Sequence, residues 1–262
     1  MRKINIFLIV FAILLITPVF YAFGENEEVK VPVLLYHNIM EKTDGENPLV
    51  TITPRVFREH MTALKNAGFE AITFDDFYNY AYNEAALPKK PIIISFDDGY
   101  ESNYRYTYPI LQELGIKATI FIVTETVGAI DGVNYPHFTW DEAKEMTESG
   151  LIDIQSHSHS HQDISLLSES EAVREIRLSK YLIETNLDKK CEVFAYPFGS
   201  VTDFAAQAVS EAGYKMQCRV GDSGYNIKNA VSQPLRRITV WGSWSADTLL
   251  DLINQNLQNG LE

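Results

Sequence analysis

The feature that most constrains the fold is an apolar run at residues 91–96 (PIIISF), which ends abruptly in Asp97, Asp98 and Gly99. A run of β-enriched residues without polar alternation is typical of a strand buried on both faces, as in a parallel sheet covered by helices. In barrels of parallel strands, active sites lie at the carboxyl ends of the strands, which is where these two aspartates stand. The alternative interpretation is a strand closed by a polar turn, because Asp-Gly is a common turn pair.

The rest of the chain alternates between strand and helix patterns. Strand patterns occupy residues 33–36, 70–74, 92–96, 118–123, 151–155, 192–196, 214–218 and 237–240. Helical patterns separate most of them and occupy residues 54–67, 102–114, 140–148, 169–186, 202–212 and 246–258. Strand–helix repetition with short connections predicts a parallel sheet with helices outside it. Since no low-complexity linker divides the sequence, we expect a single α/β domain built as a barrel of seven or eight units.

Residues 1–24 have the pattern of an export segment. Arg2 and Lys3 precede an apolar run over residues 4–23, and small residues stand near its end. Such a segment is either a cleaved signal peptide or, because it is long enough to cross a bilayer, a single N-terminal membrane anchor. Residues 25–262 then form the folded domain. We expect this domain outside the cytoplasm, either secreted or associated with the cell envelope.

Charge and cysteine content limit the partners and the covalent links. The formal net charge of −13 argues against nucleic acid or an anionic membrane surface as a partner, and we expect a monomer. Disulfides persist outside the cytoplasm. Cys191 and Cys218 therefore either pair with each other or are two small buried side chains.

A second group of chemically active residues follows the strand pattern at 151–155. His157, His159 and His161 are three of the six histidines in the chain, a density that packing alone does not explain. If the segment begins a helical turn, His157 and His161 share a face and reach one metal ion, while His159 points elsewhere. Two imidazoles and one carboxylate, with a fourth position open to water, form a common catalytic zinc site. The alternatives are a solvated polar loop and an adventitious metal-binding tract.

Three motifs, in this order, resemble those of the polysaccharide deacetylases, carbohydrate esterase family 4, also called the NodB homology domain. They are SFDDG at residues 95–99, SHSHSH at residues 156–161 and YPFG at residues 196–199. The resemblance extends from about residue 31 to the last helical pattern. It implies a distorted β/α barrel, with residues 25–262 as the catalytic domain.

The resemblance also implies a role for each motif residue. Asp97 is expected to be the general base, while Asp98, His157 and His161 are expected to hold a divalent metal ion. Zinc is the expected ion, with cobalt or nickel as alternatives. The backbone N–H of Phe198 would help to hold the oxyanion. The residues expected to contact the substrate are Tyr100, Tyr196 and Pro197.

Two features depart from the family pattern. Many members have an arginine two residues before the proline of the third motif, where it orients the base, but this chain has Ala195 there. The late leucine-x-histidine motif that supplies the general acid is also missing, since no histidine follows His161. Residues 32–39 (PVLLYHNI) resemble the opening of a circularly permuted branch that includes exported poly-N-acetylglucosamine deacetylases. In that branch, an early Tyr-His motif supplies the acid.

His37 is therefore expected to be the general acid, although a lone histidine after a strand is often structural. His60 and His137 are expected to be surface or packing residues. The resemblance implies a metal-dependent hydrolase that removes N-acetyl groups from an extracellular polysaccharide containing N-acetylglucosamine. Two alternatives are a metal-dependent amidase acting on a small cyclic amide or a peptide, and a catalytically silent sugar-binding relative. The missing arginine and the missing late histidine motivate the second alternative.

Overall fold

The computed structural model describes residues 28–41, 49–131, 135–220 and 224–258. In these residues, eight strands form one sheet in which every pair is parallel. The strands are β1 (Val33–Tyr36), β4 (Glu70–Ala71), β5 (Pro91–Phe96), β6 (Ala118–Ile122), β7 (Ile152–Ser156), β8 (Val193–Ala195), β9 (Met216–Cys218) and β10 (Ile238–Thr239). Two further short strands, β2 (Asn38–Ile39) and β3 (Thr51–Ile52), pair with each other.

The large sheet closes into a distorted barrel. Its strand order is β10-β1-β5-β6-β7-β8-β9, and β4 pairs with the start of β5. The segment at residues 235–239 closes the barrel, because Leu235 bridges to Cys218 at the end of β9. In the same segment, Ile238 pairs with Leu34 of β1. The predicted single-domain α/β barrel is confirmed.

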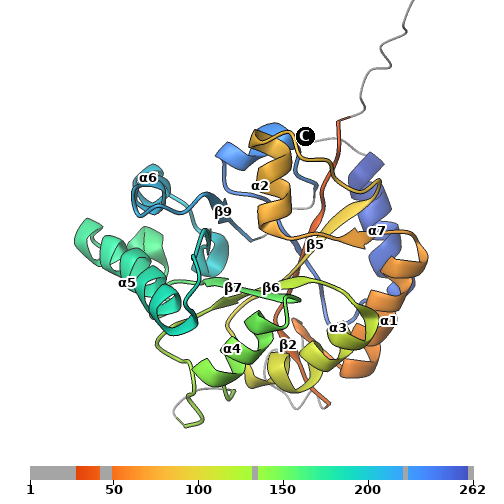
Figure 1. Cartoon of the computed structure of the whole chain (residues 1–262), viewed down its shortest axis with the longest axis horizontal. Coiled ribbons are helices and arrows are strands. Elements are labelled where there is room, and N and C mark those ends of the chain that lie inside the picture. Colours follow the sequence, from red (N-terminus) through yellow and green to blue (C-terminus); the bar gives the residue numbers. More distant parts are fainter. Residues whose placement is uncertain (1–27, 42–48, 132–134, 221–223, 259–262) are drawn as a thin grey trace, which may run out of the picture.

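Helices surround the strands (Figure 1). They are α1 (Pro54–Asn66), α2 (Phe74–Tyr82), α3 (Tyr108–Leu114), α4 (Trp140–Glu148), α5 (Glu169–Leu187), α6 (Asp203–Glu211) and α7 (Ala246–Gln258). Shorter turns are the π-helical η1 (Asn103–Thr107) and the 3-10 turns η2 (Ile164–Leu166), η3 (Pro197–Gly199) and η4 (Lys228–Ser232). The bounds of α4 match the prediction, since a capping box between Thr139 and Glu142 fixes where this helix begins.

Helix α2 corrects the predicted strand over residues 70–74. Strand β4 ends at Ala71, and Thr73 is the N-cap of a helix. The Thr73 hydroxyl accepts the Asp76 N–H, while the Asp76 carboxylate accepts the Thr73 N–H. This capping box satisfies two amide groups at the helix start and outweighs the β-propensity of Phe74. The predicted helix over residues 102–114 is also divided, because its first part is the π-helical turn η1.

Two apolar clusters stabilise the barrel. The larger one lies between the strands and the surrounding helices. The smaller one combines strand residues such as Ile93 and Phe121 with Phe74 and Phe77 of α2. Phe74 is fully buried and packs edge-on against Phe121 at a centroid distance of 5.6 Å. Helix α2 therefore contributes directly to the core of the barrel.

The predicted export segment, residues 1–24, lies outside the described residues. Among the helices that the structure describes, none combines the length and the apolar character needed to cross a bilayer. Cys191 and Cys218 are both buried and carry free thiols. Of the two interpretations of these cysteines, the structure has the small buried side chains.

Because Phe74 joins α2 to the core, Phe74→Ala should lower the free energy of unfolding by about 3–5 kcal/mol, as is usual for a truncated buried phenylalanine. Tyr82, at the end of the same helix, is 54% exposed. Tyr82→Ala should therefore change the free energy of unfolding by less than about 1 kcal/mol. Urea unfolding followed by circular dichroism measures both variants, and equal losses would contradict this packing role of α2.

Candidate active site

The sequence-predicted catalytic residues lie at the carboxyl ends of the strands. Asp97 and Asp98 directly follow β5, and His157 directly follows β7. His37 follows β1, the parallel neighbour of β5. Because parallel strands end at the same edge of a barrel, these side chains lie around one mouth.

Asp97 forms a bidentate ion pair with Arg237. The Nη1 and Nη2 atoms of Arg237 donate to Oδ1 and Oδ2 of Asp97, each at 2.7 Å. The two residues are 140 positions apart in the chain, and Asp97 and Arg237 are only 1% and 0% exposed. Arg237 Nε also donates to the Arg219 carbonyl oxygen at 3.2 Å. Both oxygens of Asp97 are therefore held in a fixed orientation by the segment that closes the barrel.

This pair determines the charge of Asp97. Burial by itself would raise the pKa of the Asp97 carboxyl, but Arg237, together with His157 and His37, lowers that pKa to about 2. Asp97 is therefore ionised at neutral pH. Because the usual pKa of an unfolded aspartate is about 3.9, the interaction stabilises the fold above about pH 4. This contribution is lost as the pH falls toward 2.

Asp98, His157 and His161 form a compact group of metal-ligand type. Their ligand atoms all lie within 4.8 Å of one another. The Nε2 atoms of His161 and His157 are 3.3 Å and 3.7 Å from Asp98 Oδ1. His157 Nδ1 lies 2.9 Å from the Ala195 carbonyl oxygen, so it donates there and the Nε2 lone pair faces the group. Burial lowers the pKa of His157, which keeps the ring in the neutral state that binds metal ions.

The loop that carries these histidines is not the predicted helical turn. Ser158 and His161 have φ values of 69° and 58°, in the left-handed region that L-residues rarely adopt. Glu175 of α5 stabilises this loop, because its carboxylate accepts the N–H groups of His159 and Ser160. The two imidazoles of the ligand group still meet, with ring centroids 5.0 Å apart. Their meeting follows from the loop conformation and not from helical spacing.

A turn after β5 separates the directions of the two aspartates. Asp98 has a φ of 74° and Gly99 a φ of 81°. A Cβ atom on Gly99 would lie 3.0 Å from Ile122 Cγ2, so the turn requires glycine on both counts. The Tyr100 hydroxyl donates to the Asp98 carboxylate, and burial together with this neighbour raises the pKa of Tyr100. Asp98 is thereby oriented toward both histidines. Asp97 pairs with Arg237, and its Oδ2 also lies 3.6 Å from His157 Nε2.

The residues of the third motif (YPFG, residues 196–199) differ in their exposure to solvent. Tyr196 and Pro197 are buried, and the Tyr196 hydroxyl donates to Gln217. This burial removes both side chains from the predicted set of substrate contacts. Phe198 is 65% exposed and has a φ of 58°. Its ring contacts that of His161 at a centroid distance of 4.9 Å, so the Phe198 side chain lies against one member of the ligand group.

The remaining histidines have other surroundings. His60 is fully buried with both ring nitrogens hydrogen-bonded, as expected of a packing residue. His159 points away from the ligand group, and its Nδ1 lies 2.9 Å from the Thr124 hydroxyl. His137 is buried, and burial lowers its pKa while the nearby Asp98 carboxylate opposes this change. His137 therefore packs beside the ligand group without belonging to it.

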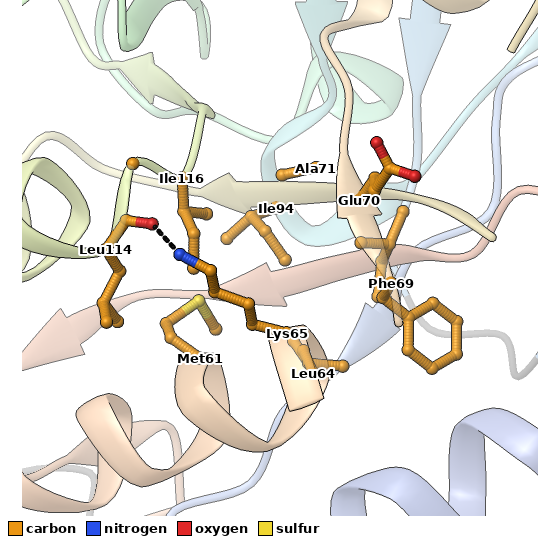
Figure 2. Close-up of a pocket in the computed structure, with 11 residues that line it drawn as sticks. Met61, Leu64, Lys65, Phe69, Glu70, Ala71, Ile94, Leu114 and Ile116 are labelled. Atoms are coloured by element: carbon orange, nitrogen blue, oxygen red, sulfur yellow. Dashed lines mark hydrogen bonds between the residues drawn. The ribbon is translucent and has the colours of Figure 1, made fainter. Parts of the chain in front are cut away.

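A cavity of about 220 Å³ lies elsewhere in the barrel (Figure 2). It is lined mainly by apolar side chains such as Met61, Leu64 and Ile94. The ammonium group of Lys65, on its wall, donates to the Leu114 carbonyl oxygen at 2.8 Å. Its described lining lacks the converging polar groups that mark a catalytic site. The candidate active site is therefore the mouth formed by the strand ends.

Comparison with known proteins identifies the family. The sequence profile of the polysaccharide deacetylase family matches residues 84–217, more than half of the chain. The chain belongs to the polysaccharide deacetylase family. YxkH of Bacillus subtilis (strain 168) is 29% identical over 191 residues, which are 73% of this chain and 64% of that protein. The poly-beta-1,6-N-acetyl-D-glucosamine N-deacetylase of Staphylococcus aureus (strain MRSA252) is 30% identical over 173 residues, 63% of this chain and 59% of that protein.

The chain thus spans less than two thirds of the length of these relatives. Among solved structures, the Streptococcus pyogenes deacetylase PplD in complex with acetate superposes with a TM-score of 0.78 at 25% identity, over 86% of this chain and 99% of that chain. BC0361, a polysaccharide deacetylase from Bacillus cereus, has a TM-score of 0.76 at 26% identity, over 86% of this chain and 69% of that chain. The predicted family is confirmed.

Sequence reasoning missed Arg237. With Ala195 at the family position, the residue that orients the base was expected to be absent, yet the structure brings Arg237 to Asp97 from the position just before β10. The sequence did contain one signal: Arg237 begins a strand pattern that continues through the mostly apolar residues 238–240. A charged side chain in a buried strand requires a buried partner of opposite charge. Nothing in the local pattern identifies that partner.

Because the Asp97 carboxylate is buried, removing its cation should destabilise the fold. Arg237→Gln should lower the free energy of unfolding at pH 7 by about 3–5 kcal/mol, the usual cost of breaking a buried ion pair. The pKa of Asp97 should rise in this variant, so the loss should be smaller at pH 5, where the carboxyl takes up a proton. Arg236→Gln, at the half-buried neighbouring position, is the matched control. Urea unfolding at both pH values measures the effect, and equal losses in the two variants would contradict it.

Proposed function

We propose that the protein is a metal-dependent hydrolase that removes N-acetyl groups from an extracellular polysaccharide containing N-acetylglucosamine. The observation that carries this proposal is the position of Asp97, fixed and ionised by Arg237, beside the ligand group of Asp98, His157 and His161. Family membership supports the reaction class. The name of the Staphylococcus aureus relative supports an N-acetylglucosamine polymer as the substrate.

The ligand group fits a divalent cation such as Zn2+, with Co2+ or Ni2+ as alternatives. One carboxylate and two neutral imidazoles are common donors for such ions. The contact of His157 with the Ala195 carbonyl and that of Asp98 with Tyr100 orient two of the three donors. A cation bound there would polarise the acetyl carbonyl and lower the pKa of a water molecule.

Asp97 is the proposed acceptor of the proton from the attacking water. Arg237 keeps its carboxylate ionised and its oxygens oriented. Because the pKa of Asp97 is low, the carboxyl holds this proton only transiently and releases it to the next acceptor. The backbone N–H of Phe198, whose ring contacts His161, is the proposed donor to the oxyanion that forms as the carbonyl is attacked.

His37 is the proposed general acid. An amide nitrogen leaves as an amine only if it is protonated as the C–N bond breaks. The His37 ring is close enough to Asp97 for its charge to contribute to the low pKa of that carboxyl. As an imidazolium it can therefore donate a proton to the leaving nitrogen within the same mouth.

The surroundings of the mouth suit a sugar. Tyr100 lines a cavity of about 420 Å³ together with Tyr106 and Tyr135, and aromatic walls of this kind stack against sugar rings. Tyr100 is accordingly the proposed substrate contact. The ion pair with Arg237 favours an active enzyme over a silent sugar-binding relative, since the missing arginine motivated that alternative. Residues 1–24, as a signal peptide or an anchor, would place the catalytic domain outside the cytoplasm.

The metal site is tested by single substitutions. His157→Ala and His161→Ala should each abolish stoichiometric binding of Zn2+, because each removes one of three donors. His159→Ala should leave binding nearly unchanged, since its ring bonds to Thr124. Metal content of the purified variants, measured by mass spectrometry after dialysis, checks this. Equal losses in all three variants would show that the ligand group is wrongly assigned.

The base and the acid are separated by the choice of substrate. Asp97→Asn should lower acetate release from N-acetylglucosamine oligomers by roughly two to four orders of magnitude, the usual contribution of general acid–base catalysis. It should impair an activated aryl acetate ester as well, because both reactions require water activation. His37→Ala should impair the amide far more than the ester, whose phenolate leaves without a proton. Parent-level amide hydrolysis by His37→Ala would exclude the acid role of His37.

A further inference from the structure

The start of η1 holds the backbone around His37. The Asn103 Nδ2 atom donates to the His37 carbonyl oxygen at 3.0 Å. The neighbouring Ser102 hydroxyl donates to Asn38 Oδ1 at 2.6 Å and accepts the Ile39 N–H at 3.3 Å. Two consecutive residues thus bind three consecutive residues at the end of β1. The conformation of His37 therefore depends on a turn that follows the aspartates of β5.

Two buried polar atoms at this junction have no hydrogen-bond partner in the described part of the chain. They are His37 Nδ1 and Asn103 Oδ1. Asn103 is fully buried. Its amide orientation is fixed, because only the NH₂ group can donate to the His37 carbonyl, which leaves Oδ1 as a free acceptor. Each unsatisfied buried group of this kind costs about 1–3 kcal/mol.

The two atoms are complementary. When His37 carries protons on both ring nitrogens, Nδ1–H is a donor without an acceptor. Asn103 Oδ1 is an acceptor without a donor, on a residue already bonded to the His37 backbone. A hydrogen bond at Nδ1 fixes the rotation of an imidazole ring and thereby the direction of Nε2.

We propose that Asn103 is a positioning residue for His37. The structure has no direct hydrogen bond between Asn103 Oδ1 and His37 Nδ1, so the proposed contact runs through one buried water molecule, which accepts the Nδ1–H and donates to Oδ1. This contact directs Nε2–H toward the leaving nitrogen. The inference rests on the proposed role of His37 as the general acid. Asn103 is not a member of the ligand group, and its proposed effect on the reaction is exerted through His37.

Thr107, in the same π-helical turn η1 as Asn103, supplies a matched control. π-helical turns within longer helices occur frequently at functional sites. Thr107, at the other end of η1, is also fully buried, with an Oγ1 atom that has no partner in the described residues. Unlike Asn103, Thr107 makes no hydrogen bond to His37 among the described residues. Thr107→Val therefore changes polarity and packing in the same element without changing the proposed contact.

The test uses two variants of Asn103 in the full chain with bound Zn2+. Asn103→Leu removes both polar atoms at similar volume, whereas Asn103→Asp keeps an acceptor and removes the donor. The measurements are kcat and KM for acetate release from an N-acetylglucosamine oligomer and for an activated aryl acetate ester, with the metal content of each variant. Asn103→Leu should lower kcat for the amide roughly tenfold to a hundredfold, the cost of an unsatisfied buried donor. The ester rate, the KM and the metal content should stay near the parent values.

Asn103→Asp should retain most of the amide activity, and Thr107→Val should retain both activities. Equal losses in Asn103→Leu and Asn103→Asp would overturn the proposal, because the contact with the His37 carbonyl would then be the one that matters. Equal losses on amide and ester, or the same loss in Thr107→Val, would also overturn it. If His37→Ala selectively impairs the amide while Asn103→Leu does not, the positioning role fails and the acid role of His37 stands. If His37→Ala has no effect on the amide, both fail.

Discussion

The buried ion pair between Asp97 and Arg237 is the interaction on which the site depends. It joins the end of β5 to the segment that closes the barrel, and both side chains are removed from water. A buried carboxylate without this partner would be strongly disfavoured, so barrel closure and ionisation of Asp97 occur together. The pair also leaves Asp98 free for a different task. Because the backbone turns sharply at Asp98 and Gly99, Asp97 pairs with Arg237 and Asp98 approaches His161, while both carboxylates lie within 4 Å of His157 Nε2.

The sequence contains enough information for the fold and for most of the site, but not for the contacts between distant segments. The apolar run before Asp97 predicts a buried parallel strand, and the order of the three motifs leads to Asp98, His157 and His161. Arg237 escapes such reasoning because its partner lies 140 positions away and no local pattern links the two. The start of α2 was available in principle, since Thr73 and Asp76 form a recognisable capping box.

The conformation of the histidine loop escapes prediction for a different reason. Helical spacing would bring His157 and His161 together, and they do meet, but through left-handed backbone at Ser158 and His161. Of the six non-glycine residues with positive φ in the described structure, four lie at the site, among them Asp98 and Phe198. Such conformations each cost about 1–3 kcal/mol and persist only where surrounding contacts impose them. Here the carboxylate of Glu175, on helix α5, accepts the N–H groups of His159 and Ser160 and so helps to hold the strained backbone of the histidine loop.

The late position of the closing segment, residues 235–239, determines when the candidate site is complete. The ion pair between Asp97 and Arg237 forms only when residues 235–239 take their place between β9 and β1. A chain that is still being synthesised therefore contains the three motifs at residues 95–99, 156–161 and 196–199 before it contains the cation that keeps the Asp97 carboxylate ionised. The topology therefore delays completion of the candidate site until the segment that includes β10 has packed into the barrel.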